Sequence, residues 1–300
     1  RLAYDLENLI SPTLAAIFLA FVSYQALFFG TFIGFLGSAV LVVSVILPSP
    51  TASVPRGIYE RTTRGLRIYL ATPRLRGLLS LNLAAAAAGA MVLVNTVVLV
   101  RSGLGFGETE VALALGAFGG GSMLAALLLP RLLDQRPDRP VMIAGAGVLV
   151  ITLLGLAGLS AFNGTGWYLL LAGWVVIGIG YSTVLTPSGR LLKRSAHPED
   201  RPAVYAAQFA LSHACWLVTY PLAGWLITDF GAATAFAVLA LISITGLIGG
   251  VVLWPRGDAD VVEHSHDDLA PDHPHLSGES RHAHSIIIDD NHPRWPTSRV

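Results

Sequence analysis

The chain has 300 residues, of which 53% are hydrophobic and only 13% are charged, about half of the charge that soluble domains carry. Its 19 basic residues balance its 19 acidic residues, so no basic field indicates a nucleic-acid partner. Its one cysteine, Cys215, excludes an internal disulfide and a cysteine-based zinc site.

Long apolar runs follow one another along most of the chain. A helix that crosses a membrane needs about 20 mostly apolar residues, and in lipid its backbone must satisfy its own hydrogen bonds. The pattern therefore predicts an all-α membrane protein with eight transmembrane helices. Their expected spans are 5–22, 25–47, 76–100, 110–130, 141–162, 167–189, 203–227 and 231–254.

The first expected helix begins with two acidic residues, Asp5 and Glu7, in the stretch YDLENLISP. Charged groups inside a membrane span are costly and usually functional, so these carboxylates are candidates to bind a cation or to accept a proton. The alternative is that both acids lie in the interfacial first turn, where the helix dipole favours them.

The basic residues of the loops alternate in their placement along the chain. Segments 48–75, 131–140 and 190–202 together hold twelve Arg and Lys residues, whereas the intervening loops hold only Arg101. Because cytoplasmic loops carry the excess of Lys and Arg, we expect these three segments to be cytoplasmic. The protein would then be a multi-pass protein of the bacterial inner membrane with a cytoplasmic C-terminal tail.

Two of the expected helices carry small or amide side chains. The stretch GAFGGGS (116–122) lacks the Lys-Ser/Thr of a phosphate-binding loop and the strand of a dinucleotide site. We interpret it as a surface for close helix packing or as a flexible gate. Asn82 and Asn95 are expected to make hydrogen bonds between helices.

The expected helix 203–227 separates polar and aromatic residues from apolar ones. At 100° per residue, the polar and aromatic residues fall within about 140° of arc. This polar face comprises Tyr205, Gln208, Ser212, His213, Trp216, Thr219 and Tyr220. A helix surrounded by lipid has no reason to segregate polar groups, so the face should point to a central cavity or to a neighbouring helix. His213 could carry a proton or bind a metal, or it could only make an interhelical hydrogen bond.

The tail, residues 256–300, holds seven of the nine histidines and nine acidic residues. Its histidines come as three His-x-His pairs that start nine residues apart, followed by a single histidine: His264, His266, His273, His275, His282, His284 and His292. We expect the tail to be disordered, because it has too few apolar residues for a core. Imidazole suits Ni, Co and Zn, so the pattern predicts a metal-binding tail. The alternative is a solvated, low-complexity end.

Two motifs resemble those of the major facilitator superfamily of transporters. PRLLDQRPDR (130–139) is similar to the loop motif G-x-L-x-D-R-x-G-R-R, with Asp134 and Arg139 at matching positions and prolines where two glycines are expected. The stretch SPTLAA resembles the exporter motif G-P-x-x-G-G, with Pro12 kept and with Ser11, Ala15 and Ala16 in place of the glycines.

The resemblance implies an arrangement of the whole chain. Residues 1–47 would be the last two helices of an N-terminal bundle, 48–75 a basic cytoplasmic linker and 76–255 a C-terminal six-helix bundle. The chain would then cover helices five to twelve of a twelve-helix transporter, and we expect the rest of the N-terminal half to be missing from it. Transport would proceed by alternating access around a site near the membrane midplane.

We expect a proton-coupled exporter of a divalent transition metal, because the histidine-rich tail is similar to that of nickel- and cobalt-resistance exporters of the superfamily. Transport itself would need no cofactor, and the partners would be the lipid bilayer and a small ion or molecule. One alternative is an exporter of organic solutes, such as a drug or siderophore, and another is a non-transporting membrane metal sensor. The chain contains neither a Ser-His-Asp set nor an H-E-x-x-H motif, so we expect no enzyme.

Overall fold

The computed structural model describes residues 22, 24–45, 57–162, 164–258, 261–265, 281–290 and 292–296. The first expected helix therefore lies almost wholly outside the described residues, and with it Asp5, Glu7 and the motif formed by Ser11, Pro12, Ala15 and Ala16.

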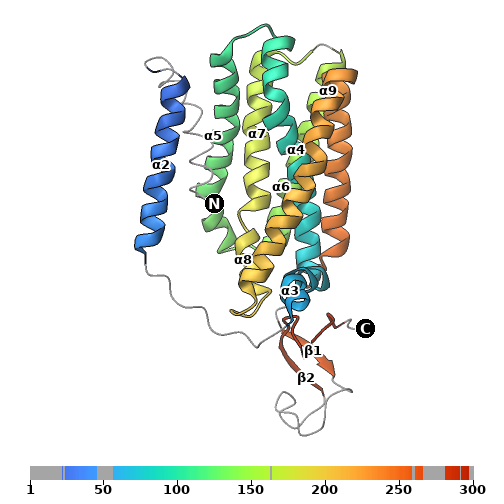
Figure 1. Ribbon diagram of the computed structural model, residues 1–300. Coiled ribbons are helices and arrows are strands. Elements are labelled where there is room, and N and C mark those ends of the chain that lie inside the picture. Colours follow the sequence, from blue (N-terminus) through green and yellow to red (C-terminus); the bar gives the residue numbers. More distant parts are fainter. Residues whose placement is uncertain are drawn as a thin grey trace.

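The described chain is helical apart from one hairpin of two short strands (Figure 1). The helices are α2 (Tyr24–Ser44), α3 (Ile58–Ala71), α4 (Pro73–Val97) with its π-helical extension η1 (Val98–Gly103), α5 (Glu108–Leu133), α6 (Asp138–Phe162), α7 (Trp167–Leu185), α8 (Ser188–Arg194) and α9 (Arg201–Leu253). The strands are β1 (Val261–Ser265) and β2 (Arg281–Ser285).

The count of eight transmembrane helices is not supported. Among the described residues, five helices are long and apolar enough to cross a membrane, and the described apolar part of α2, Phe28–Ser44, is shorter. The two expected helices 203–227 and 231–254 appear as the single 53-residue α9, which contains a break at Gly231. The backbone there has φ 81° and ψ 173°, a conformation open in practice only to glycine, so α9 consists of two helices joined at this residue.

The bundle is built around α4, whose alanine-rich middle is fully enclosed. It packs against α9, while α5 packs against α7 and α6 packs against both α7 and α9. A Cβ atom at Gly121 of α5 would lie 2.1 Å from the carbonyl oxygen of Val175 of α7. One at Gly178 of α7 would lie 2.1 Å from the carbonyl oxygen of Phe118. The GAFGGGS stretch is thus a surface of close helix packing.

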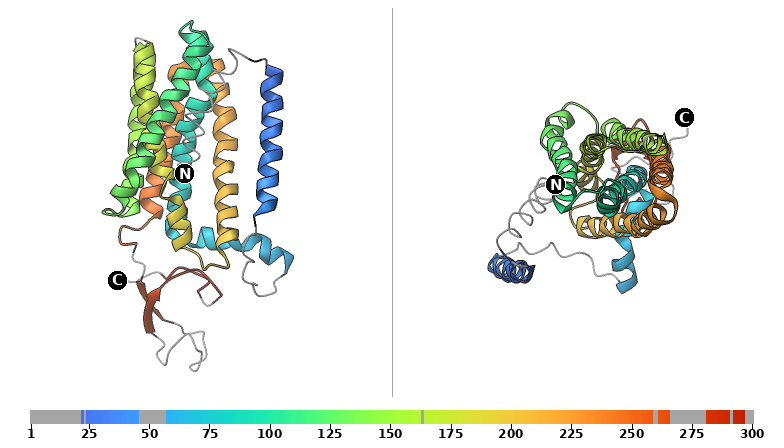
Figure 2. Two further views of the ribbon diagram at one scale, coloured as in Figure 1. Left: turned by 90° about the vertical axis from the view of Figure 1, so that its left-hand side faces the viewer. Right: turned by 90° about the horizontal axis from the view of Figure 1, so that it is seen from above.

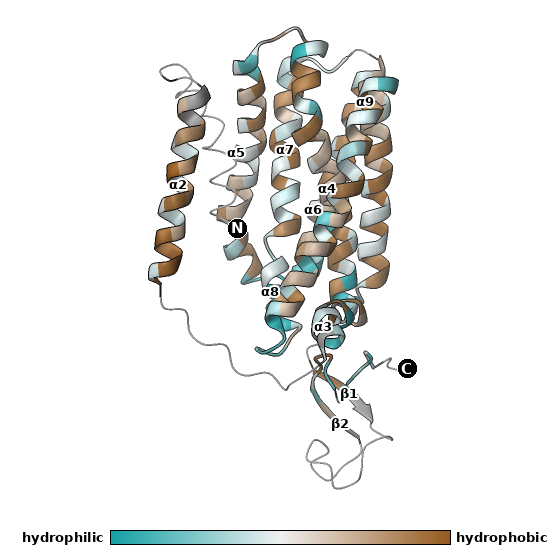
Figure 3. Cartoon of the chain, viewed as in Figure 1, coloured by the Kyte–Doolittle hydropathy of each residue, from teal (hydrophilic) through white to brown (hydrophobic). Residues whose placement is uncertain are grey.

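One end of the bundle collects the basic segments of the chain, and we call it the α3 end. Helix α3 lies across this end, next to α8 and to the hairpin (Figures 1 and 2). Helix α2 stands apart from the other helices in both views. The long helices are mostly apolar (Figure 3), and many of their large apolar side chains are exposed, as contact with lipid or with further helices requires.

The C-terminal tail was expected to be disordered, and part of it lies among the described residues. Strands β1 and β2 are antiparallel, and the residues that follow β2 return to the bundle, where Ile286 and Ile288 are buried. The tail has too few apolar residues for a core of its own, but Ile288 packs against the apolar core of the bundle, which tail composition alone does not reveal.

Candidate functional site

Part of the polar face of α9 lies against neighbouring helices, whereas Tyr205 and His213 on the same face are exposed. The hydroxyl of Tyr69 in α3 donates a hydrogen bond to Oε1 of Gln208, and the hydroxyl of Tyr205 donates to the carbonyl of Gly189 at 2.9 Å. Burial raises the pKa of Tyr69, so its hydroxyl keeps the proton that it donates. Buried Thr219 donates to a carbonyl of α4 at 3.3 Å. On the other side of the helix, Leu217 and Val218 are exposed.

The same face carries a row of neighbouring rings, which we call the aromatic row: Phe209, His213, Trp216 and Tyr220. Successive ring centroids are 3.9, 6.2 and 5.0 Å apart. Nδ1 of His213 lies 2.8 Å from the carbonyl oxygen of Phe209. Because a carbonyl can only accept, Nδ1 is the donor, and Nε2 of the neutral ring carries the lone pair. That nitrogen is the atom of this row suited to accept a proton or to bind a ligand. Ser212 donates to the same carbonyl at 3.0 Å.

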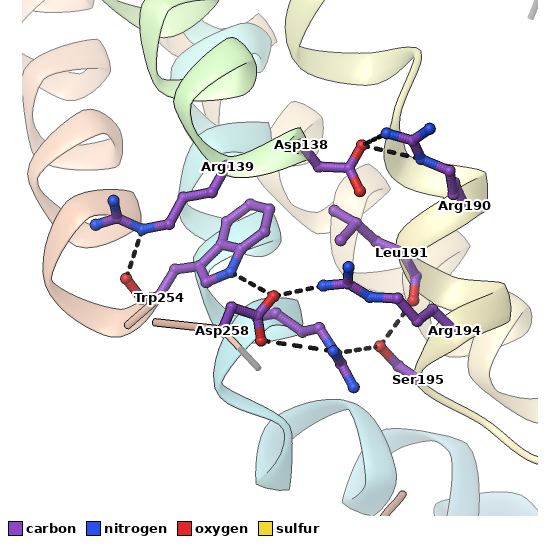
Figure 4. Close-up of polar contacts among 9 residues, drawn as sticks. Asp138, Arg139, Arg190, Leu191, Arg194, Ser195, Trp254 and Asp258 are labelled. Carbon is purple, nitrogen blue, oxygen red and sulfur yellow. Dashed lines mark hydrogen bonds and ion pairs between the residues drawn. The ribbon is translucent and has the colours of Figure 1, made fainter. Parts of the chain in front are cut away.

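A polar network joins the helices at the α3 end (Figure 4). Asp138, at the start of α6, is only 5% exposed, and its carboxylate accepts hydrogen bonds from Nε of Arg190 at 3.0 Å and from Nη2. The same guanidinium donates to the carbonyl of Leu133 at 3.2 Å. One arginine of α8 thereby holds the end of α5 and the start of α6 together.

A second carboxylate in this network, Asp258, follows the end of α9. It accepts from Nη2 of Arg194 at 2.5 Å and from Nε1 of Trp254 at 3.0 Å. Arg74 approaches it at 3.5 Å and donates through Nε to Oγ of Ser195 at 2.9 Å. The network therefore fastens α4, α8 and the end of α9 to one another (Figure 4).

The two residues of the predicted loop motif have different surroundings. Asp134 is exposed, whereas Arg139 donates to the carbonyls of Trp254 at 2.8 Å and Val251 at 3.0 Å. The buried and paired acid of this loop is Asp138, which the sequence analysis missed. Its signal was the position directly before the expected helix, where an acid is favoured by the helix dipole.

The tail is fastened to the α3 end by ionic contacts. Arg64 of α3 donates to both carboxylate oxygens of Asp200, at 2.5 and 2.7 Å, and to Asp290 of the tail at 3.0 Å. These contacts, with the bond to Asp200 first among them, raise the pKa of Arg64 above its ordinary value, so the guanidinium stays charged. Arg74 lies over the ring of Trp295, 5.3 Å from its centroid. A cation at this distance is attracted by the ring.

A carboxylate of the tail, Asp289, lies between two histidines. Oδ1 accepts from the backbone N–H of His292 at 2.8 Å and faces its Nδ1 at 2.9 Å, while Oδ2 is 3.3 Å from Nε2 of His197. Burial acts to raise the pKa of Asp289, but the hydrogen bonds from His292 and His197 hold it below its usual value. The carboxylate is therefore ionised at neutral pH.

The hairpin brings part of the histidine repeat together. Its register pairs His264 with His282 and Val262 with His284, and the rings of His284 and His292 have centroids 4.9 Å apart. His266, His273 and His275 lie outside the described residues. Within the described part of the chain, no three His, Cys, Asp or Glu side chains form a group that could hold a metal ion.

These apolar helices, with a polar network at one end and a polar face along α9, define a multi-pass membrane protein of the transporter class. Residues 78–271 match the family model of the Major Facilitator Superfamily. Because the match covers more than half of the chain, the chain belongs to this superfamily and is a secondary transporter. The resemblance drawn from the two motifs is thereby confirmed at the level of the superfamily.

Proposed function

We propose that this transporter exports a divalent transition metal such as Ni²⁺, Co²⁺ or Zn²⁺ in exchange for protons. The observation that carries the proposal is the hairpin register, which places His264 opposite His282, in a strand that also contains His284. Residues directly opposite each other in an antiparallel pair have Cβ atoms about 4.5–5.5 Å apart. Histidines that recur at paired positions of a hairpin favour a metal ion over an organic molecule.

The proposed direction of transport follows from the end of the bundle that we place on the cytoplasmic side. The basic segments gather at the α3 end, and the excess of Lys and Arg marks the cytoplasmic side. The tail would then bind metal inside the cell, at the entrance for export. Asp5, Glu7 and Nε2 of His213 are the groups that we propose for cation or proton transfer within the membrane.

A second candidate function is the export of an organic solute. The aromatic row favours it, because neighbouring rings suit a planar or cationic organic molecule at least as well as a metal ion. Because the superfamily consists of transporters, we do not propose a non-transporting metal sensor.

The test expresses the gene that encodes this chain in a bacterial host made sensitive to nickel, cobalt and zinc by deletion of its own exporters. Growth and cell-associated metal are measured with the intact gene and with residues 259–300 deleted. We expect the intact gene to raise tolerance and to lower accumulation of at least one metal, and the deletion to reduce both effects. Unchanged tolerance and accumulation with the intact gene contradict metal export. Equal effects with and without the tail support metal export but contradict a role of the tail in it.

A further inference from the structure

We propose that a cavity at the α3 end, between the start of α6 and the end of α9, binds the headgroup of an anionic phospholipid through Arg139 and Arg256. The headgroup phosphate lies against these two guanidinium groups, and an acyl chain follows the apolar outer face of α9. The inference does not depend on the proposed function, because it concerns the membrane around the transporter and not the substrate that it carries.

The cavity has a volume of about 580 Å³ and lies where two of the long apolar helices have their ends. Its walls come from residues 137–140, at the start of α6, and from Trp254 and residues 256–258, which follow α9. Arg194 of α8 also lines it. Ligand-binding cavities typically have about 300–1,000 Å³, so this cavity is large enough for a lipid headgroup.

The acidic residues of the cavity already have cationic partners. The carboxylate of Asp138 points away from Arg139 and accepts hydrogen bonds from Arg190 (Figure 4). The carboxylate of Asp258 accepts from Nη2 of Arg194 at 2.5 Å. An anion that enters the cavity therefore meets carboxylates whose charge is compensated by a neighbouring guanidinium group.

Arg139 and Arg256 bring positive charge that no carboxylate balances within the described part of the chain. Arg139 donates through Nε and Nη2 to the carbonyls of Trp254 and Val251, which are neutral acceptors. Arg256 is exposed and makes neither a hydrogen bond nor an ion pair with any described residue. Guanidinium groups are well matched to phosphate oxygens in charge and geometry. A phosphate is therefore the anion that suits these two side chains.

The surface next to the cavity favours a phospholipid over free phosphate. Three exposed apolar residues share one side of α9 at helical spacing: Leu241, Ile248 and Val252. Nη2 of Arg139 binds the carbonyl of Val251, so this guanidinium lies at the end of the apolar strip. A phospholipid covers both surfaces at once, with its phosphate in the cavity and an acyl chain along the strip. Basic pockets at the ends of membrane helices bind anionic headgroups.

The experiment measures lipid binding to the purified full chain by native mass spectrometry, with phosphatidylglycerol added in steps. We expect the protein to retain phosphatidylglycerol in preference to zwitterionic phosphatidylcholine. Arg256→Gln should weaken the binding of phosphatidylglycerol about fivefold, because one basic residue near an anionic lipid surface contributes about that factor. Arg256→Lys keeps the charge and should restore most of the affinity.

Arg139→Gln should weaken the binding of phosphatidylglycerol to a similar extent. The matched control is Arg136→Gln, which removes the same charge from an exposed position of the same loop, outside the cavity. It should change the affinity less than about twofold, because solvent and salt screen a charge that does not contact the lipid. The melting temperature without added lipid checks the fold of each variant, and Arg256→Gln should leave it unchanged because Arg256 makes no contact of this kind with the described residues.

Competition with glycerol 1-phosphate separates a lipid site from a site for free phosphate. We expect glycerol 1-phosphate at the concentration of the lipid to leave phosphatidylglycerol bound, because it lacks the acyl chains that pack on α9. Displacement at equal concentration overturns the proposal in favour of a free phosphate. Equal retention of phosphatidylglycerol and phosphatidylcholine, or equal losses for Arg136→Gln and Arg256→Gln, overturns it as well.

Discussion

At the scale of single residues, the carboxylate of Asp138 is a buried charge of the polar network with a defined partner. It is buried, and its partner Arg190 is about half exposed. Asp138→Asn leaves that guanidinium without its carboxylate, which costs about 1–3 kcal/mol. We expect a fall in melting temperature of about 2–12 °C, measured on the purified protein in detergent. Asp134→Asn, a few residues earlier at an exposed position, should change it by less than about 2 °C. Equal shifts for the two variants would show that the ion pair does not stabilise the bundle.

His213 offers a residue-scale test of proton coupling. In the proposed function Nε2 of His213 accepts the coupled proton, so His213→Ala should remove most of the metal transport driven by a pH gradient. The measurement is metal flux in inverted membrane vesicles with and without an imposed gradient. Ser212→Ala is the control, because the Ser212 hydroxyl contacts only a carbonyl of its own helix among the contacts described. Retained gradient dependence in His213→Ala excludes this histidine as the proton carrier.

The polar face of α9 shows what periodicity can predict about such residues. The face was recognised because helical spacing gathers Gln208, Trp216 and Thr219 on one side, and the structure places them toward other helices. The paired acid of the α5–α6 loop was not recognised. Asp134 matches the motif in sequence, but Asp138 is the acid within reach of Arg190, which lies 52 residues further along the chain. Sequence spacing within a loop carries no information about such distant partners.

At the scale of elements, the packing of α5 against α7 depends on glycine at defined positions. Gly121→Ala would place a Cβ against the backbone of Val175, whereas Gly120→Ala places one where no atom lies within 4 Å. Overpacking of this kind costs about 1–3 kcal/mol, while alanine at an open helical position gains up to about 1 kcal/mol. Thermal unfolding should therefore separate the two variants, with Gly121→Ala less stable and Gly120→Ala unchanged or more stable. Equal stability would mean that the helices can move apart at no cost.

The predicted helices agree with the structure where the length of an apolar run is enough to determine a helix. They differ where a local backbone conformation or a contact with a distant segment determines the structure. The expected helices 110–130 and 141–162 lie inside α5 and α6. The loop 48–75 was expected to be a linker, but its second half contains the amphipathic helix α3, whose residues Ile68 and Tyr69 are buried under α9 and its neighbours. The prediction for the tail rested on its composition alone, although Ile288 packs against core residues from other segments.

At the scale of the whole molecule, segments far apart in the chain meet at the α3 end. Helix α3, the loop before α9 and the tail are joined there by Arg64, which contacts Asp200 and Asp290 at once. Any opening of this end during alternating access must move these segments together or break the contacts between them. The contacts made by Arg64 are therefore suited to couple the position of the tail to the state of the transporter.

The coupling can be tested by removing Arg64 alone. Arg64→Ala leaves Asp200, itself 7% exposed, without this partner and removes the contact between α3 and Asp290 of the tail. We expect faster hydrogen exchange in two separate segments, 196–200 and 286–290, in protein reconstituted in nanodiscs. Arg67→Ala is the matched control, because Arg67 lies one turn further along α3 with an exposed side chain. It should leave exchange in both segments unchanged. Faster exchange confined to α3 itself would contradict the coupling, because the loop and the tail would then be held independently of this arginine.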